Sequence, residues 1–181
     1  MIFRVRTGIA VLAVAATASA LAGCGEDSTE GQASPRSGEP KPTKSGPSGT
    51  NLSKQQLCEL LSGQEARELS VEAGGTPGVY AGDPACKWAS DKASVNLTFN
   101  NKGTSKDLNI QTKSTPVKIN GRNGVLIEYP PAPNCGVVVD LTEKSMTRAM
   151  VSVLSAGQAE RLDPCELAQQ AATMATKKIS G

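Results

Sequence analysis

Residues 51–181 predict an α+β sandwich, in which an antiparallel β-sheet is packed by short N-terminal helices and by one C-terminal helix. Three observations support this fold class. Helix-start patterns occur near both ends of the segment, runs of β-branched and apolar residues lie between them, and four cysteines are spread over both kinds of pattern. The length, about 130 residues, is that of one domain with one core.

Two short helices are predicted at the N-terminal end of this segment. Each begins with a capping box, a serine followed three residues later by Gln or Glu, in which the two side chains satisfy backbone N–H groups at the helix start. Ser53 starts the first predicted helix, over residues 54–61, and Ser62 starts the second, over residues 64–69. The first helix has an apolar stripe for the core, formed by Leu57, Leu60 and Leu61.

A long loop is predicted after these helices. Residues 73–84 contain four glycines and two prolines, which interrupt both helices and strands. Loops of this length in compact domains often carry binding residues. Tyr80, which lies among the glycines, is therefore a candidate contact residue with an exposed side chain.

The middle of the segment predicts the strands of the sheet. Val95, Leu97 and Phe99 alternate with polar residues, as in a strand with one buried face. The pair Asn120-Gly121 is a hairpin-turn signal. Further strands are expected at 117–119, 125–129, 137–141 and 148–154.

Two more aromatic residues are candidate contacts. Tyr129 begins the rigid sequence Tyr-Pro-Pro-Ala-Pro, which would end a strand and could present an exposed surface. Trp88 lies two residues after Cys86, and for this tryptophan we favour packing in the core against a disulfide over contact with a partner.

A C-terminal helix is predicted from Asp163 onward. Asp163, Pro164 and Glu166 fit the N-cap, N1 and N3 positions of a helix start. The residues expected on the buried face of this helix are Leu167, Ala171 and Met174. Together with the N-terminal helices, it would cover the sheet.

Residues 1–23 fit a bacterial lipoprotein signal peptide. Two arginines within the first six residues precede an apolar run of about 14 residues, which is shorter than the roughly 20 residues of a membrane-spanning helix. The run ends in Leu-Ala-Gly-Cys24, which resembles the bacterial lipobox. The resemblance implies a diacylglyceryl group on the Cys24 sulfur and cleavage just before it. An ordinary secreted protein with a chance thiol at Cys24 is the alternative.

Residues 24–50 are then the lipidated cysteine and a disordered tether. The tether consists mainly of Gly, Ser, Pro, Thr and Glu and is too polar to offset the entropy of folding. About 26 flexible residues span roughly 25–31 Å. We therefore expect the protein on the extracytoplasmic face of the cell membrane, held there by lipid on Cys24.

The remaining cysteines predict two disulfide bonds. Outside the cytoplasm thiols oxidise, and spacings of 28, 49 and 30 residues without any histidine do not fit a zinc site. Four cysteines allow three pairings. Local context favours sequential pairing, because Cys58 and Cys165 lie in helical patterns whereas Cys86 and Cys135 lie in extended ones. Each bond would then fasten one helix to one strand.

Composition argues against several function classes. The chain has 19 basic and 17 acidic residues, and removal of residues 1–23 takes away two arginines and leaves a formally neutral protein. Nucleic-acid binding is therefore not indicated by charge. The absence of histidine excludes Ser-His and Cys-His catalysis and histidine-bound metals. We expect no enzyme activity, no metal and no cofactor.

The features above together resemble a family of small actinobacterial cell-envelope lipoproteins of unknown function. The resemblance implies an antiparallel sheet packed by helices and supports two disulfides, and it implies no catalytic residue. It is carried by the lipobox, the low-complexity tether, Leu57-Cys58-Glu59-Leu60-Leu61, Cys86-Lys87-Trp88, the Cys135 strand and Asp163-Pro164-Cys165-Glu166-Leu167-Ala168.

These expectations lead to two functional hypotheses, with an enzyme that uses a nonstandard site as a third and least favoured one. The first is a membrane-anchored, non-enzymatic binding or interaction module, whose partner is an envelope protein or a small ligand. The alternative is a carrier that holds a small molecule or lipid in a pocket between the sheet and the helices.

Overall fold

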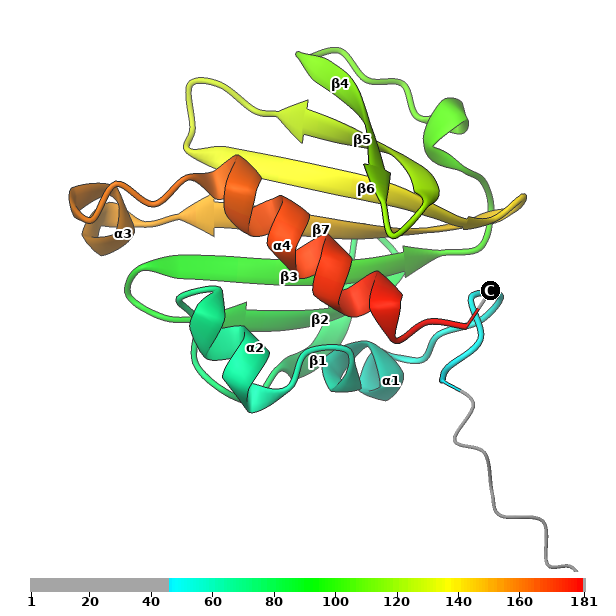
Figure 1. Cartoon of the computed structure of the whole chain (residues 1–181), viewed down its shortest axis with the longest axis horizontal. Helices are drawn as coiled ribbons and strands as arrows, with labels where there is room; N and C mark the ends of the chain where they lie inside the picture. The colour runs from blue at the N-terminus through cyan, green and yellow to red at the C-terminus, as the bar shows by residue number, and fades with distance from the viewer. Residues whose placement is uncertain (1–45, 181) are drawn as a thin grey trace, which may run out of the picture. The chain divides into compact units, whose positions relative to one another are not determined.

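The computed structural model describes residues 46–180, which form the predicted α+β arrangement (Figure 1). Seven strands make one antiparallel sheet in the order β1-β2-β3-β7-β6-β5-β4, so β7 is the central strand and β1 and β4 are the edges. The strands are β1 (Thr76–Tyr80), β2 (Asp83–Ala89), β3 (Ala93–Asn100), β4 (Ser114–Ile119), β5 (Arg122–Glu128), β6 (Asn134–Thr142) and β7 (Ser145–Val153). The helices are α1 (Lys54–Glu59), α2 (Gly63–Glu68), the 3-10 turn η1 (Ser105–Asp107), α3 (Ser155–Ala159) and α4 (Pro164–Lys177).

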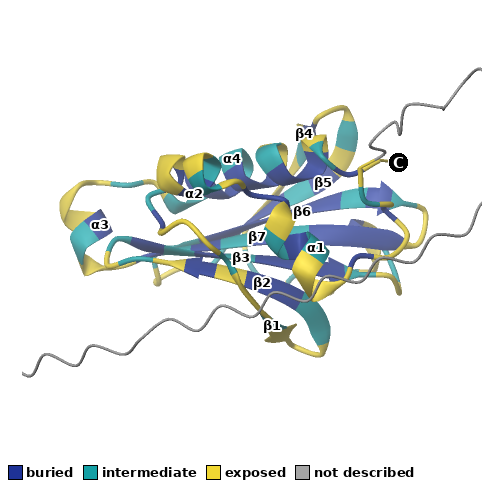
Figure 2. Ribbon diagram, turned by 90° about the horizontal axis from the view of Figure 1, so that it is seen from below, coloured by how far each residue is buried: buried dark blue, intermediate teal, exposed yellow. Residues whose placement is uncertain are grey.

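The helices α1, α2 and α4 share one core with one face of the sheet. Their buried residues belong to the same apolar cluster as the inward residues of the strands. Figure 2 shows α2 and α4 on one side of the sheet, with the buried residues between the layers. The space between these layers is filled by nearly solvent-free side chains, among them Leu57, Leu69, Val137, Val151 and Ala171.

Both predicted N-terminal helices are confirmed, together with their capping boxes. The Ser53 hydroxyl accepts from the Gln56 backbone N–H at 3.2 Å, and the Gln56 side chain accepts from the Ser53 N–H at 2.9 Å. Ser62 and Glu65 repeat this exchange at the start of α2, at 3.3 and 2.7 Å. Because these bonds are made within four residues, sequence is enough to locate the helix starts.

The prediction of a continuous loop over residues 73–84 is wrong. This stretch contains the edge strand β1, which pairs with β2 from Thr76 opposite Lys87 to Tyr80 opposite Asp83. Ala81 and Gly82 both have positive φ, 51° and 88°, which is the backbone of a tight two-residue hairpin turn. Proline is tolerated in an edge strand, so the proline and glycines that suggested a loop are compatible with β1.

The other predicted strands correspond to β3 to β7, with differences of a few residues at their ends. The turn predicted at Asn120-Gly121 joins β4 and β5, and both residues have positive φ, 50° and 79°. Sequence analysis did not predict α3 or η1. Each is a single short turn. The N-cap residue of α3 makes no side-chain hydrogen bond to the helix start. At η1 a local signal was present, since the Asp107 carboxylate accepts from the Thr104 N–H and hydroxyl at 2.7 and 3.0 Å.

The two disulfides pair as local context favoured. One joins Cys58 of α1 to Cys86 of β2, and the other joins Cys135 of β6 to Cys165 of α4. The start of α4 is also confirmed, because the Asp163 side chain accepts from the N–H groups of Cys165 and Glu166 at 2.8 and 3.3 Å. Each bond thus fastens a helix to the sheet that it covers.

The beginning and the end of the described chain run side by side. Ser48 and Ser180 form a parallel bridge, with Gly49 N–H donating to the Ser180 carbonyl at 2.9 Å and Ser180 N–H donating to the Pro47 carbonyl at 3.1 Å. Ordered contacts therefore start before residue 51, the expected end of the tether. The predicted signal peptide, Cys24 and most of the predicted tether lie outside the described residues.

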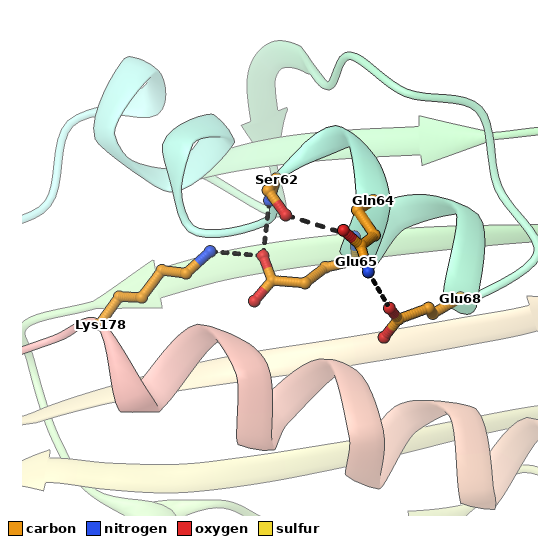
Figure 3. A network of polar contacts seen from close by, with 5 residues as sticks. All are labelled: Ser62, Gln64, Glu65, Glu68 and Lys178. Carbon is orange, nitrogen blue, oxygen red and sulfur yellow. Dashed lines mark hydrogen bonds and ion pairs between the residues drawn. The ribbon is translucent and has the colours of Figure 1, made fainter.

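A polar network fastens α2 to the end of α4 (Figure 3). Lys178 Nζ lies 2.5 Å from Glu65 Oε2, the same oxygen that accepts from the Ser62 N–H. Burial alone would raise the pKa of the Glu65 carboxyl. Hydrogen bonds from Lys178 and Ser62, with the charge of Lys178, outweigh this effect and lower the pKa below its ordinary value of 4.5.

The network makes the stability of the folded domain depend on pH. Since the folded pKa of Glu65 is depressed, its contribution to stability is present above pH 4.5 and is lost as pH falls below that value through the folded pKa. We expect Glu65→Gln to flatten the acid branch of the unfolding free energy between pH 5 and pH 3, measured by urea denaturation. Glu68→Gln is the matched control, because Glu68 lies in the same helix but accepts its hydrogen bond from the neutral side chain of Gln64, at 3.1 Å. An equal change in both variants would contradict the assignment.

Candidate binding site

The face of the sheet opposite the helices, here called the distal face, is less uniformly apolar than the core face. In β7, Ala149, Val151 and Val153 belong to the core beneath the helices. Since side chains alternate along a strand, Arg148 and Met150 point to the distal face. The central strand thus carries a charged residue at the middle of this face.

Part of the distal face is covered by the chain between β3 and β4. A small apolar cluster of Ile127, Val138 and Met146 lies here, and Leu108 and Ile110 from this connection pack against it. The Asp140 carboxylate holds the connection in place, accepting from the Ser105 N–H at 2.6 Å and the Ser105 hydroxyl at 2.9 Å. The hydroxyl of Thr112 adds a hydrogen bond to the Glu128 carbonyl at 2.7 Å. The connection held by these hydrogen bonds forms one wall of a hollow.

Arg148 is partly buried, and its position is set by the strands on both sides of β7. It lies opposite Thr98 of β3 and opposite Val138 of β6. Neither neighbour carries a charge. The guanidinium carries N–H donors arranged as a rigid fork and no acceptor, so within the sheet it has no charged partner in register.

Two acidic side chains of this face, Asp83 and Asp140, accept hydrogen bonds from residues other than Arg148. Asp83 accepts two bonds from the Asn100 amide, at 3.1 and 3.0 Å, and Asp140 is held by Ser105. The three ion pairs among residues 46–180 join Lys92 to Glu160, Lys113 to Glu128 and Lys178 to Glu65. Within the described part of the chain, Arg148 therefore has no ion-pair partner.

Two hollows meet at Arg148. The smaller, about 30 Å³, is lined by Tyr80, Ala81, Asp83, Thr98, Asn100, Met146 and Arg148. The larger, about 210 Å³, is lined by Leu108, Asn109, Ile110, Gln111, Thr112, Ile127, Tyr129 and Arg148. We call the two hollows with Arg148 between them the Arg148 site. It combines one cation, two tyrosines and an apolar wall, with the carboxylate of Asp83 in the smaller hollow.

Two of the candidate contact residues lie in this site. Tyr80 has 44% of its surface exposed at the end of the β1–β2 hairpin. Tyr129 lies beyond the end of β5, and its ring lies over Gly136 of β6, where an added Cβ would be 3.5 Å from the ring atom Cε2. Two tyrosines that are 49 residues apart in the sequence thus line separate hollows, and Arg148 borders both hollows.

Arg148 itself was missed by sequence analysis, although a signal was present. It is the single charged residue in the strand sequence Ser-Met-Thr-Arg-Ala-Met-Val-Ser-Val. A lone cation in a strand that is otherwise uncharged and mostly buried is unusual, because burial of a charge is costly unless it is paired. This alone does not reveal which residues surround it.

Trp88 lies in the core and not in the site. Only 1% of its surface is exposed, and it packs beside Cys86 as the sequence favoured. Gly75 approaches both closely: an added Cβ would lie 2.3 Å from Cys86 Sγ and 2.6 Å from the indole atom Cε2. This close approach explains the need for glycine at position 75.

A third hollow, larger than the two of the Arg148 site, also borders Tyr129. It measures about 400 Å³ and includes the cis peptide bond Pro130-Pro131 and the acidic residues Glu128 and Asp163. Both acids are engaged, Glu128 with Lys113 at 2.7 Å and Asp163 as the cap of α4. Because both of these acidic side chains already have partners within the domain, this hollow is a weaker candidate than the Arg148 site.

The chemistry available in the Arg148 site is recognition of an anion. Residues 46–180 contain no group of three or more Cys, Asp or Glu side chains arranged to hold a metal ion. No helix in the same range is both long and apolar enough to cross a bilayer. The site offers guanidinium, phenol and amide groups beside an apolar surface, which suits non-covalent binding.

Comparison with known proteins gives one match. No curated protein and no solved structure matches this chain. A model of the family described as "protein of unknown function (DUF3558)" matches residues 19–178, which is most of the chain and includes every helix and strand described above. The protein therefore belongs to the DUF3558 family.

Proposed function

We propose that the protein is a non-enzymatic binding module of the cell envelope, tethered to the extracytoplasmic face of the membrane by lipid on Cys24. It presents the distal face of its sheet to an envelope protein or small ligand. The observation that carries this proposal is Arg148, a partly buried cation with no ion-pair partner in residues 46–180, set between two hollows and two tyrosines.

The anchor is supported by the sequence before the domain. The lipobox ending at Cys24 provides the attachment point, and 21 residues separate Cys24 from Gly46, where the described chain begins. A flexible chain of that length spans roughly 25 Å. This distance would let the domain reach partners close to the membrane while leaving its distal face accessible.

The alternative, a carrier with a pocket between sheet and helices, has less support. That space is filled by buried side chains of α1, α2, α4 and the sheet. Binding there would require the helices to separate from the sheet, and the two disulfides oppose this movement at α1 and α4. The distal face requires no such opening.

Site-directed photo-crosslinking in the native host tests the binding surface. A photoreactive phenylalanine analogue at Tyr80 or Tyr129 is expected to capture a partner, because both side chains border the Arg148 site. The control is the same analogue at Thr173, an exposed residue of α4 on the opposite layer. Equal capture from all three positions, or from Thr173 alone, would overturn the assignment of the distal face.

The anchor is tested separately by Cys24→Ala. We expect this variant to lose incorporation of radiolabelled fatty acid and to move from the membrane fraction to the soluble or secreted fraction, because the thioether-forming sulfur is gone. Cys24→Ser controls for side-chain size and should behave in the same way. Unchanged membrane association in both variants would show that lipid on Cys24 is not the anchor.

A further inference from the structure

We propose that the Arg148 site binds a small carboxylate, whose acid group pairs with Arg148 and whose apolar body lies against Leu108, Ile110 and Ile127. This inference rests on the proposed function and names the ligand class of the same surface. Four features of the site carry it: the guanidinium without an ion-pair partner in residues 46–180, the size of the larger hollow, the apolar wall and the single cation.

The guanidinium is positioned to receive an anion. Arg148 lies in the central strand, flanked by Thr98 and Val138, so its backbone is fixed by hydrogen-bonded neighbours on both sides. A partly buried cation loses hydration that an internal partner would normally restore. A carboxylate can restore it with two parallel hydrogen bonds, which is the geometry that the planar fork of arginine matches.

The larger hollow sets the size of the ligand. Its volume of about 210 Å³ equals that of roughly seven water molecules. This is below the 300–1,000 Å³ of pockets for drug-sized molecules. The space suits a compact acid of the size of benzoate or hexanoate and is too small for a diacyl lipid.

The lining provides a place for an apolar body next to the charge. Ile127 belongs to the buried cluster of the distal face, and Leu108, Ile110 and Tyr129 pack against that cluster. These side chains form one side of the hollow, while the polar residues Asn109, Gln111 and Thr112 line the rest. A ligand with one charged end and one apolar end would satisfy both parts of this surface.

The single cation favours a monoanion. No lysine lines either hollow, and Arg148 is the only basic residue in both. A phosphate monoester carries close to two negative charges at neutral pH and three acceptor oxygens, which one guanidinium would leave partly unpaired. A carboxylate brings one charge and two oxygens, which one guanidinium can pair completely.

The test is an NMR titration of the full-length exported protein with benzoate and, in parallel, with the neutral analogue benzamide. We expect benzoate to shift the resonances of residues 108–112, 127 and 148 and benzamide to bind much more weakly. Arg148→Gln should weaken benzoate binding about 10- to 100-fold, the range for losing hydrogen bonds to a charged group. Arg67→Gln, which removes an exposed arginine of α2, should leave binding unchanged.

A second variant keeps the proposal testable if Arg148→Gln fails to fold. Ile110→Ala should weaken hexanoate binding by about fourfold for each methylene that loses contact and should leave the much weaker acetate binding unchanged. Equal binding of benzoate and benzamide, equal affinity of wild type and Arg148→Gln, or no shift at millimolar benzoate would each overturn the carboxylate assignment.

The two proposals can fail separately. Capture of a partner from Tyr80 and Tyr129, combined with no carboxylate binding, would reject the ligand class and leave the distal face as a protein-binding surface. Carboxylate binding that depends on Arg148, with no crosslinked partner, would support a small-molecule receptor.

Discussion

Trp88→Ala is expected to lower the free energy of unfolding by about 3–5 kcal/mol, the range for removing a large aromatic side chain from a packed core. Trp88 is 1% exposed and packs with Cys86 in the main apolar cluster. A cavity of this size cannot collapse easily, because the nearby disulfide ties α1 to β2 and holds the two layers in place. Urea unfolding followed by circular dichroism measures the change, since the variant lacks the only tryptophan.

Trp88→Phe separates packing from hydrogen bonding. The indole Nε1–H is buried and has no acceptor among residues 46–180, and an unsatisfied buried donor costs about 1–3 kcal/mol. Phenylalanine removes that donor and keeps much of the apolar contact, so its loss of stability should be well below that of Trp88→Ala. Tyr80→Ala, at an exposed aromatic position, is the control and should change stability by about 0.5 kcal/mol or less. Similar losses for Trp88→Ala and Tyr80→Ala would contradict the core role of Trp88.

Double variants that each lack one of the two disulfides should also be strongly destabilised. Replacing both Cys58 and Cys86 with alanine, or both Cys135 and Cys165, should lower the free energy of unfolding by about 3–4 kcal/mol in each case. The separations of 28 and 30 residues are similar, and the chain-entropy estimate depends on loop length. Removing both partners together avoids a free thiol that could form wrong pairs.

Local measurements should distinguish the two bonds. Without Cys58–Cys86, hydrogen exchange should increase first in α1, a helix of six residues that is too short to be stable on its own. Without Cys135–Cys165, the increase should begin at the start of α4, where Asp163 still caps the helix. Wild-type protein treated with reductant should lose at least as much stability as either paired variant. Unchanged stability on reduction would contradict a stabilising role for the disulfides.

Elements with local signals could be predicted from the sequence. The capping boxes at Ser53 and Ser62, the Asp163-Pro164 helix start and the Asn120-Gly121 turn each depend on contacts within about four residues. The same information favoured one of the three possible disulfide pairings, which the structure confirms, because helical and extended contexts indicated which cysteines lie on helices and which on strands. The edge strand β1 was missed because its conformation depends on pairing with β2, which outweighs the loop tendency of its one proline and one glycine.

Only part of the candidate site could be predicted from the sequence. Tyr80 and Tyr129 were identified individually as candidate contacts, but no sequence pattern connected them. Their common neighbour Arg148 lies in the central strand, and its importance depends on which residues surround it. The apolar wall is also non-local, since the connection containing Leu108 and Ile110 is held by Asp140, which follows Ser105 by 35 residues.

The sequence by itself determined the helix starts, most strands, the α+β class and the two disulfides, because each follows from backbone and side-chain preferences over short distances. It also contains the Leu-Ala-Gly-Cys24 sequence, whose resemblance to a lipobox is the basis of the proposed anchor. Only the tertiary structure decided that β1 is a strand and that two tyrosines lie at one site with a cation lacking an ion-pair partner in the described chain. These features require residues from distant parts of the sequence to meet, and the pairing order of the sheet determines which residues do so.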